Sequence, residues 1–265
     1  MNIQNEQYLL RKLGQHLEVL APFVLAFSGG LDSRFLAHVA HSARLPFEAV
    51  HVEGPHVSPK QSELAVNWLK KRNIVAHRVQ FNPLPILDVQ LNNKNRCYAC
   101  KKEMFLHICA LSRGRPVLEG SNKSDLSKFR PGLRAIEELG VISPLAFNNI
   151  GKPQIISLAK ATGLDNPEQP SRPCLLTRFE YGMTPSKELL KKITAAEEEI
   201  FNEGFNDFRL RLRQEEPPLL QVAWAEAAKM EQKQAKLQQI LNWHGFENVE
   251  IHAEINLSGY FDLPS

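Results

Sequence analysis

The sequence predicts an α/β protein with a parallel β-sheet, followed by a smaller C-terminal α+β domain. Apolar runs of strand length alternate with helix-period segments through the first two-thirds of the chain. Near Thr184 the pattern changes to helix, strand, strand, helix, strand. Alternating strands and helices are typical of βαβ units, whose crossover helices cover both faces of a parallel sheet. We therefore expect one domain at residues 1–183 and a second at residues 184–265.

In the first domain, the apolar run at residues 23–27 predicts a buried strand, because parallel strands are covered on both faces. Residues 82–96, with two prolines and several asparagines, predict a long loop. Three prolines within residues 164–173 exclude regular structure there. The remaining elements are expected as strands at residues 47–52, 74–81 and 115–120 and as helices at residues 32–41 and 58–72.

The second domain is predicted from the same kinds of pattern. Trp224 and Trp243 flank its last predicted helix at positions typical of a core. The elements are expected as helices at residues 185–202 and 225–244 and as strands at residues 207–213, 219–224 and 248–255.

The composition excludes several classes of protein. With 265 residues, 43% hydrophobic and 23% charged, the chain has the make-up of an ordinary globular protein rather than a disordered one. No apolar run approaches the length of a membrane span, and the N-terminus lacks a secretory signal, so we expect a cytoplasmic protein. Its four cysteines therefore indicate metal or redox chemistry before disulfides.

Charge is spread unevenly along the chain. Residues 1–185 carry 23 Lys and Arg against 15 Asp and Glu, a net charge of +8, whereas residues 186–265 carry 9 against 14, a net charge of −5. The basic part suits a phosphate-bearing ligand, but a protein that binds long nucleic acids usually has a stronger basic footprint. Ordinary surface variation is an equally good reading of this asymmetry.

The strongest local motif lies directly after the strand predicted at residues 23–27. It consists of Ser28, Gly29 and Gly30, followed by Asp32 and Ser33 at the start of a helix. Glycines permit close backbone approach to a ligand, and N–H groups at a helix start bind anions. The motif therefore predicts a phosphate site, with Asp32 as a cap or a magnesium ligand; the alternative is a plain turn with Ser and Asp as caps.

Strand, SGGxDS and helix together resemble the PP-loop of the N-type ATP pyrophosphatases, which have an adenine nucleotide alpha hydrolase-like fold. The chain has no GxxxxGK[ST] string, so a Walker-type site is excluded. The resemblance implies ATP and Mg²⁺ as ligands of Ser28, Gly29, Gly30, Asp32 and Ser33. It also implies cleavage of ATP to AMP and pyrophosphate, in which a substrate oxygen is adenylated and then displaced by a nucleophile.

A second motif combines Cys97 and Cys100, spaced as CxxC, with Cys174 in the later proline-rich segment. Two thiolates at this spacing can bind one metal centre, and three fit a 4Fe–4S cluster with one iron that has no protein ligand. A zinc site would need a fourth ligand such as Cys109 or His107, although Cys109 lies in an apolar helical run and is interpreted as a core residue. Thiols without a metal are the remaining alternative.

A third motif is the alternation of arginine and leucine at residues 208–213. Because side chains alternate along a strand, Arg209, Arg211 and Arg213 are expected on one face and the leucines on the other. A row of guanidinium groups can bind phosphate. The alternative is the solvated face of an amphipathic strand.

Five further strings occur in order along the chain and, with the PP-loop, are similar to the LarE family of ATP-dependent sulfur transferases. These enzymes build the nickel-pincer nucleotide of lactate racemase. The resemblance covers residues 23–205. The strings are found at residues 95–101, 119–125, 129–135, 139–145 and 173–179.

The resemblance implies that a carboxylate of a pyridinium dicarboxylate mononucleotide is adenylated and that sulfur then displaces AMP. Some family members sacrifice the sulfur of one cysteine, which matches Cys174. Others hold a 4Fe–4S cluster on three cysteines, which match Cys97, Cys100 and Cys174 as the metal-binding and catalytic residues. Because all three are present, this chain resembles the second kind.

The family also has an acidic residue and an Arg-x-Arg pair that bind the substrate nucleotide. These match Glu197, Arg209 and Arg211 in this sequence. The following strand, at residues 219–223, departs from the family's Ala-Arg-Ile-Glu-like string, and this leaves the identity of the substrate open.

The partners expected are a small nucleotide substrate, a sulfur donor protein or sulfide, and further copies of the chain in a homo-oligomer. We expect no membrane and no nucleic-acid partner. Two alternatives stay open: a PP-loop tRNA thiolase with a three-cysteine cluster, and a non-catalytic nucleotide or redox sensor.

Overall fold

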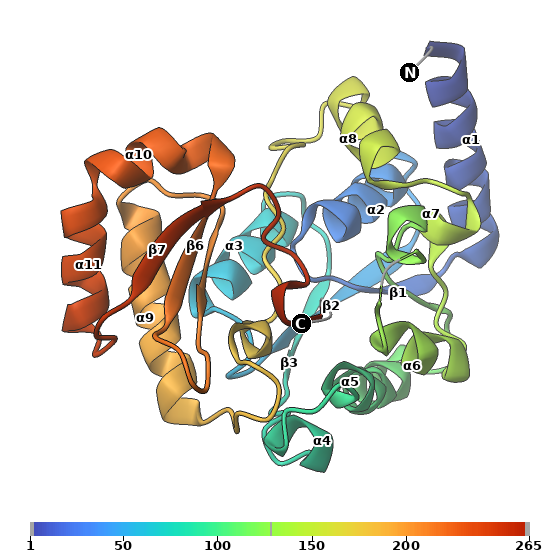
Figure 1. Cartoon of the computed structure of the whole chain (residues 1–265). Helices are drawn as coiled ribbons and strands as arrows, with labels where there is room; N and C mark the ends of the chain where they lie inside the picture. Colours follow the sequence, from blue (N-terminus) through green and yellow to red (C-terminus); the bar gives the residue numbers. More distant parts are fainter. Residues whose placement is uncertain (1–2, 128, 263–265) are drawn as a thin grey trace. The chain divides into compact units, whose positions relative to one another are not determined.

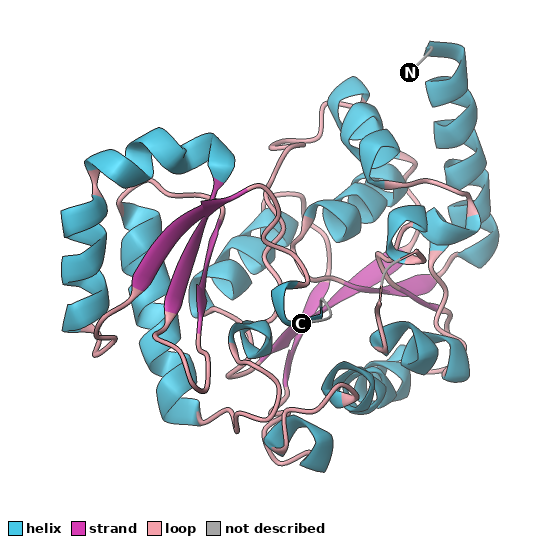
Figure 2. Cartoon of the chain, in the orientation of Figure 1, coloured by secondary structure: helices cyan, strands magenta, loops and turns pink. Residues whose placement is uncertain are grey.

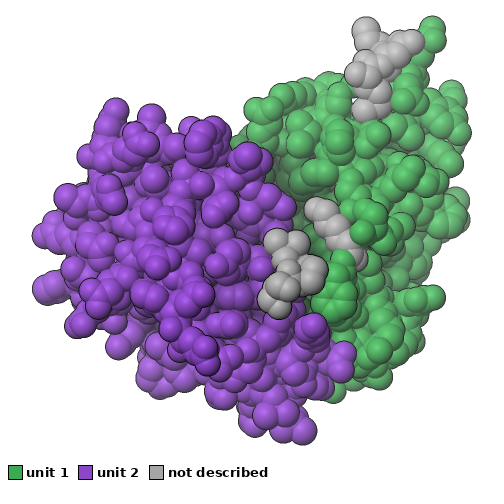
Figure 3. All heavy atoms as spheres, in the orientation of Figure 1, with its two compact units in different colours: residues 1–54, 59–81, 97–169 green, residues 55–58, 82–96, 170–265 purple. Residues whose placement is uncertain are grey.

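The computed structural model describes residues 3–127 and 129–262. Contacts divide the chain into two compact units, which are coloured separately in Figure 3. Unit 1 comprises residues 1–54, 59–81 and 97–169, and unit 2 comprises residues 55–58, 82–96 and 170–265. The domain boundary expected between residues 183 and 184 stays a prediction.

Unit 1 is built on a four-stranded parallel sheet in the order β3-β2-β1-β4, which confirms the predicted α/β fold (Figure 1). The chain runs from β1 outward through β2 to β3 and then returns to place β4 on the other side of β1. The strands span Phe23–Ala26 (β1), Phe47–Glu53 (β2), Ala76–Gln80 (β3) and Val117–Leu118 (β4).

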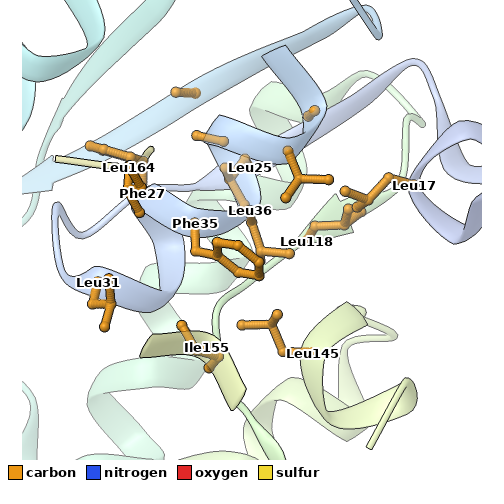
Figure 4. Packing of buried hydrophobic residues seen from close by; sticks show 14 of the residues in the cluster. Leu17, Leu25, Phe27, Leu31, Phe35, Leu36, Leu118, Leu145, Ile155 and Leu164 are labelled. Atoms are coloured by element: carbon orange, nitrogen blue, oxygen red, sulfur yellow. The ribbon is translucent and has the colours of Figure 1, made fainter. Parts of the chain in front are cut away.

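Successive residues of these strands enter cores on opposite faces of the sheet. In β1, Phe23 and Leu25 pack into one apolar cluster, whereas Val24 packs into the other. Leu25 and Leu118 are shown in the larger cluster in Figure 4. Such alternation follows from the pleat of a strand, and it explains why parallel strands read as continuous apolar runs.

Helices surround the sheet of unit 1 (Figure 2). Leu13 and Leu17 of the first helix are fully buried in the larger cluster, although the sequence analysis did not predict this helix. The helices span Ile3–Leu20 (α1), Leu31–Ser42 (α2), Pro59–Lys70 (α3), Arg96–Ser112 (α5), Gly132–Glu138 (α6), Pro144–Phe147 (α7) and Lys152–Ala161 (α8), and a 3₁₀ turn spans Lys123–Asp125 (η1).

Two details of the expected long loop were wrong. A single helical turn, α4 at Leu87–Gln90, interrupts it. Cys97 and Cys100, expected in the loop, lie instead in the first turns of α5, which begins at Arg96. The last of the helix-breaking prolines and asparagines in this segment is Asn95, and the residues that follow include good helix formers. The helix therefore begins directly after Asn95. Residues 164–173 are irregular, as predicted.

Unit 2 contains a mixed three-stranded sheet in the order β5-β6-β7. β5 pairs antiparallel with β6, and β6 pairs parallel with β7, so the chain needs a helical crossover between β6 and β7. α9 and α11 pack against each other beside this sheet (Figure 1). The elements span Leu175–Arg178 (η2), Lys187–Asn202 (α9), Phe208–Arg211 (β5), Leu219–Ala223 (β6), Trp224–Glu226 (η3), Ala227–Gln232 (α10), Gln234–Trp243 (α11), Glu250–Glu254 (β7) and Tyr260–Asp262 (η4).

The crossover differs from the single helix expected at residues 225–244. Lys233 leaves helical geometry, with φ −108° and ψ 13°, and divides the segment into α10 and α11. Trp224 and Trp243 were expected in a core, but both side chains are largely exposed. Among the described residues, no helix is long and apolar enough to cross a membrane.

Candidate functional site

The glycine loop, residues 28–33, lies where the strand order of unit 1 reverses. It follows β1, which lies between β2 on one side and β4 on the other. The chain therefore continues from β1 to one side of the sheet and later returns to the other side. Ligands of open α/β sheets bind beyond the carboxyl ends of the strands at such a switch point. The motif predicted from sequence is therefore at the position where this architecture accepts a ligand.

Gly29 allows the loop to turn against α3. Its φ is +77°, and a Cβ built on it would lie 2.6 Å from the Cβ of Ala65 in α3. A larger residue would meet both unfavourable backbone geometry and a clash with a helix, so glycine is required here.

The hydroxyls of the loop stiffen the start of α2. Ser28 Oγ accepts a hydrogen bond from Gly30 N at 3.3 Å, and Ser33 Oγ donates to Gly30 O at 3.1 Å. The two hydroxyl oxygens are 3.2 Å apart. Gly30 is the N-cap of α2, and no side-chain cap hydrogen bond forms at this position, so the capping role considered for Ser and Asp is not seen in the described residues. Uncapped N–H groups at a helix start favour an anion.

Asp32 faces two other segments of unit 1. Its carboxylate lies 2.7 Å from Lys152 Nζ at the start of α8, and it accepts a hydrogen bond from Asn122 Nδ2 at 3.3 Å. Gly120, after β4, passes so close that a Cβ there would lie 3.3 Å from the Cβ of Asp32. Lys152 was not among the residues predicted for this site. A lysine in the first turn of a helix is unfavourable for the helix dipole, and this unusual position could have marked Lys152 as a functional residue.

A series of contacts leads from Asp32 to the CxxC helix. Asn122 N donates to Asp125 Oδ2 at 3.1 Å, and Asp125 pairs with Arg130 at 2.9 Å. Two residues further, Gly132 lies against α5, where a Cβ on it would be 3.3 Å from the Cys97 carbonyl oxygen. Three of the ordered sequence strings are therefore brought together in unit 1.

Cys97 and Cys100 lie three residues apart on α5, so their side chains share a face of the helix. Cys97 is exposed and Cys100 half-buried, and none of the four cysteines forms a disulfide. Cys109 packs against the smaller apolar cluster, and burial raises the pKa of its thiol. Within residues 3–127 and 129–262, no group of three or more His, Cys, Asp or Glu is arranged to hold a metal ion.

The arginines of β5 in unit 2 do not form a solvated face. Arg209 and Arg211 are 3% and 2% exposed. Burial, followed by the charge of nearby Arg178, lowers the pKa of Arg209 to about 10 and that of Arg211 to about 9. Both guanidinium groups remain charged at neutral pH. Arg213 instead binds the Pro217 carbonyl at 2.7 Å and Glu250 at 2.7 Å.

Glu197 on α9 is paired with Arg178, which lies in the family-like string at residues 173–179 but was not predicted to have a role. Arg178 donates from Nε and Nη2 to the two oxygens of Glu197, at 2.6 and 2.9 Å. Leu210 N donates to the same carboxylate at 3.1 Å. Burial opposes ionisation of Glu197, but Arg178 outweighs it, and the pKa of Glu197 lies below its usual value. Arg178 interrupts the largely apolar run at residues 175–179, and this could have indicated a buried arginine that needs an acidic partner.

Cys174 lies in unit 2, directly before η2, and its side chain is half-buried. Its carbonyl oxygen accepts hydrogen bonds from Thr177 N at 3.0 Å and from Thr177 Oγ1 at 2.8 Å. Leu175 N donates to His56 O at 2.9 Å. The third predicted cysteine is thus held in an ordered turn.

Comparisons with known proteins identify relatives over about three-quarters of the chain. No family model matches it. The uncharacterized protein slr1717 of Synechocystis is 34% identical over 210 residues, 77% of this chain and 78% of that protein. The uncharacterized protein MJ0830 of Methanocaldococcus jannaschii is 35% identical over 192 residues, 71% of this chain and 73% of that protein.

A more distant relative has a named activity. The pyridinium-3,5-bisthiocarboxylic acid mononucleotide synthase of Lactiplantibacillus plantarum is 26% identical over 200 residues, 74% of this chain and 72% of the synthase. The parallel sheet of order β3-β2-β1-β4 with a loop after β1 is consistent with the PP-loop fold expected of such a relative. The chain therefore belongs to the family of slr1717 and MJ0830 and is a distant homologue of LarE.

Proposed function

We propose that this protein is an ATP-dependent sulfur transferase that acts on a carboxylate of a pyridinium dicarboxylate mononucleotide. The observation that carries the proposal is the glycine loop at the switch point of the sheet, in a chain homologous to a mononucleotide synthase. In the proposed reaction, the carboxylate attacks the α-phosphorus of ATP and pyrophosphate leaves. A sulfur nucleophile then attacks the acyl-adenylate, and AMP leaves as the thiocarboxylate forms.

The ATP site of this proposal consists of Ser28, Gly29, Gly30, Asp32 and Ser33. Uncapped N–H groups of α2 would bind the phosphates, and Asp32 would hold Mg²⁺ on them. Lys152 Nζ lies 2.7 Å from Asp32 and would be close enough to bind a phosphate oxygen of ATP if Asp32 held Mg²⁺.

Cys97, Cys100 and Cys174 would hold a 4Fe–4S cluster. The chemistry of the donor set supports this: three thiols suit a 4Fe–4S cluster, two of them share one helical face, and the third precedes an ordered turn. When bound, such a cluster would supply an iron without a protein ligand that carries sulfide. The role left to this chain is to orient the three thiols and to keep Cys109, with its raised pKa, out of the ligand set.

The substrate nucleotide would bind at Glu197, Arg209 and Arg211. Their burial supports a water-poor site, in which charge-assisted hydrogen bonds to phosphate are strong. Nε of Arg209 is a buried donor without a hydrogen-bond partner in the described chain, and a ligand oxygen would satisfy it.

Release of pyrophosphate tests the proposed chemistry. We expect the purified protein to release pyrophosphate from ATP only when the pyridinium dicarboxylate mononucleotide is present. Asp32→Asn should abolish the release, whereas Arg213→Lys should leave it intact. Release stimulated by tRNA instead of the mononucleotide would redirect the assignment to a tRNA thiolase. The absence of any turnover by metal-loaded protein would favour a nucleotide sensor.

Analysis of metal and sulfide tests the proposed cluster. Protein purified without oxygen should contain about four irons per chain with matching acid-labile sulfide. Stoichiometric zinc would make the cysteines structural. If neither metal binds after reconstitution, a loss of mass at Cys174 upon turnover would identify it as a sacrificial sulfur donor.

A further inference from the structure

We propose that Arg211, together with Arg209 and Arg178, is a positioning residue for Cys174. These arginines hold residues 171–179, called here the cysteine segment, against β5 and α9 within unit 2. The reason for positioning Cys174 rests on the proposed function, in which this thiol takes part in sulfur transfer. The positioning goes beyond that function because it gives the arginines of β5 a task before any substrate binds.

The cysteine segment is bound by arginine on both sides of Cys174. Arg209 Nη2 donates to the Ser171 carbonyl oxygen, and Arg211 Nη1 donates to the Thr177 carbonyl oxygen at 2.7 Å. Each anchored residue is three positions from Cys174. The two neighbouring arginines of β5 therefore bind the chain upstream and downstream of the thiol.

The third anchor belongs to the segment itself. Arg178 forms the paired hydrogen bonds to Glu197, and its Nη1 donates to Thr177 Oγ1 at 3.0 Å. That hydroxyl in turn donates to the Cys174 carbonyl oxygen at 2.8 Å. A continuous series of hydrogen bonds thus joins the carboxylate on α9 to the backbone of the cysteine.

Backbone pairing extends the attachment beyond Arg178. Leu212 N donates to Arg178 O at 2.7 Å, and Glu180 N donates to Leu212 O at 3.0 Å. The remaining donors of Arg211 bind Gln221 Oε1 at 3.0 Å and Leu257 O at 2.5 Å. A single guanidinium therefore ties the cysteine segment to β6 and to the chain after β7.

Burial makes these anchors stronger than surface contacts. Arg178, Arg209 and Arg211 are each nearly inaccessible to solvent. A hydrogen bond to a charged group is stronger than one between neutral groups, and a carbonyl left without its donor in such a site is costly. Arg213 follows β5 by two residues and binds Pro217 and Glu250 rather than the described residues of the cysteine segment, so it is the matched control.

Alkylation of Cys174 tests the proposal in the full chain without added substrate. Metal-depleted, reduced protein is treated with iodoacetamide over a range of pH, and peptide mass spectrometry follows Cys97, Cys100, Cys109 and Cys174 separately. In Arg211→Gln, the high-pH plateau rate at Cys174 should rise roughly ten-fold, which corresponds to about 1.4 kcal/mol of lost hydrogen bonding. Arg211→Lys should give an intermediate rate, because lysine can still reach one carbonyl.

Two comparisons separate positioning from general stability. Arg213→Gln should leave the Cys174 rate unchanged, and the rate at Cys109 in unit 1 should stay constant in all variants. If Arg211→Gln does not fold, Thr177→Val provides a second test, since it removes only the hydroxyl link to Cys174. An unchanged Cys174 rate in both variants, or an equal rise in Arg213→Gln or at Cys109, would overturn the proposal.

The outcome is independent of the enzyme assay. If Cys174 becomes reactive in Arg211→Gln but no sulfur transfer is found, the positioning role stands and the proposed function fails. If sulfur transfer is found but the alkylation rate does not change, the proposed function stands and the positioning role fails.

Discussion

Asp32 in unit 1 and Glu197 in unit 2 each pair with one basic side chain, but in very different surroundings. The side chains of Asp32 and Lys152 are 24% and 37% exposed, whereas those of Glu197 and Arg178 are 13% and 2% exposed. A partly exposed pair can exchange its partner for a ligand at small cost, because water solvates the separated charges. A buried pair has no such replacement and stays fixed. Under the proposed function, this contrast suits exchange with a ligand at the Asp32–Lys152 pair, and a positioning role for the Glu197–Arg178 pair before the substrate binds.

Removal of one partner from the buried pair should produce the largest effect. Glu197→Ala leaves the Arg178 guanidinium buried without a carboxylate, and we expect a loss of about 3–5 kcal/mol in the free energy of unfolding. Urea denaturation measures this loss. The matched variant Glu199→Ala removes a carboxylate that is 40% exposed and pairs with His244, and it should cost less than about 1 kcal/mol. Equal losses in the two variants would contradict the comparison.

Acid should loosen unit 2 through His56, whose carbonyl holds Leu175 of the cysteine segment. Burial lowers the pKa of His56 to about 4, below its ordinary value of 6.5. The unfolded chain therefore takes up a proton between pH 6.5 and pH 4 that the folded chain does not, and stability falls as the pH is lowered through this window. The whole window contributes up to about 3 kcal/mol, since one unit is 1.36 kcal/mol.

The unfolding free energy of the wild type and of His56→Gln, measured between pH 4 and pH 7, checks this expectation. The variant cannot take up the proton, so its stability should depend less steeply on pH. Parallel pH profiles would show that His56 does not contribute.

The glycine loop should be intolerant of a single methyl group. In Gly29→Ala, the new Cβ would meet Ala65 at 2.6 Å, and the residue would be strained at φ +77°. We expect a loss of about 1–3 kcal/mol in unfolding free energy and the loss of ATP binding, measured by calorimetry. Gly163→Ala separates the two causes, because Gly163 also has a positive φ but no atom within 4 Å of its Cβ position. Equal losses would mean that strain alone matters.

The sequence predicts those parts of the molecule whose conformation is determined by neighbouring residues in the chain. The strand at residues 23–26 follows from its apolar side chains, and the loop at Gly29 follows from a backbone geometry that few other residues adopt. Lys152 and Arg178 were not assigned roles. The partner of Lys152, Asp32, is distant in sequence, and the partner of Arg178, Glu197, lies on a separate helix. Only the tertiary fold brings such charges together, so neither periodicity nor motif spacing reveals the pairs.

The burial of the β5 arginines has the same kind of cause. Alternation of Arg and Leu correctly separates two faces of a strand, but it does not say what covers the polar face. Carbonyl groups of the cysteine segment and of Leu257 cover it here, and they come from parts of the chain more than 30 residues away. A solvated face would have been the ordinary outcome for that pattern, and backbone acceptors made burial of the charges possible.

The smallest effect on stability should come from the exposed pair, together with a clear effect on ligand binding. Lys152→Met removes the cation from Asp32, and because both side chains are partly exposed, the loss in unfolding free energy should be no more than about 1 kcal/mol. Binding of ATP should nevertheless weaken roughly ten-fold, since a charge-assisted hydrogen bond to phosphate is lost. Lys160→Met on the same helix breaks an exposed pair with Glu168 and controls for both measurements. If Lys152→Met destabilises the protein but leaves ATP affinity unchanged, the Asp32–Lys152 pair is structural, and the distinction between the two units disappears.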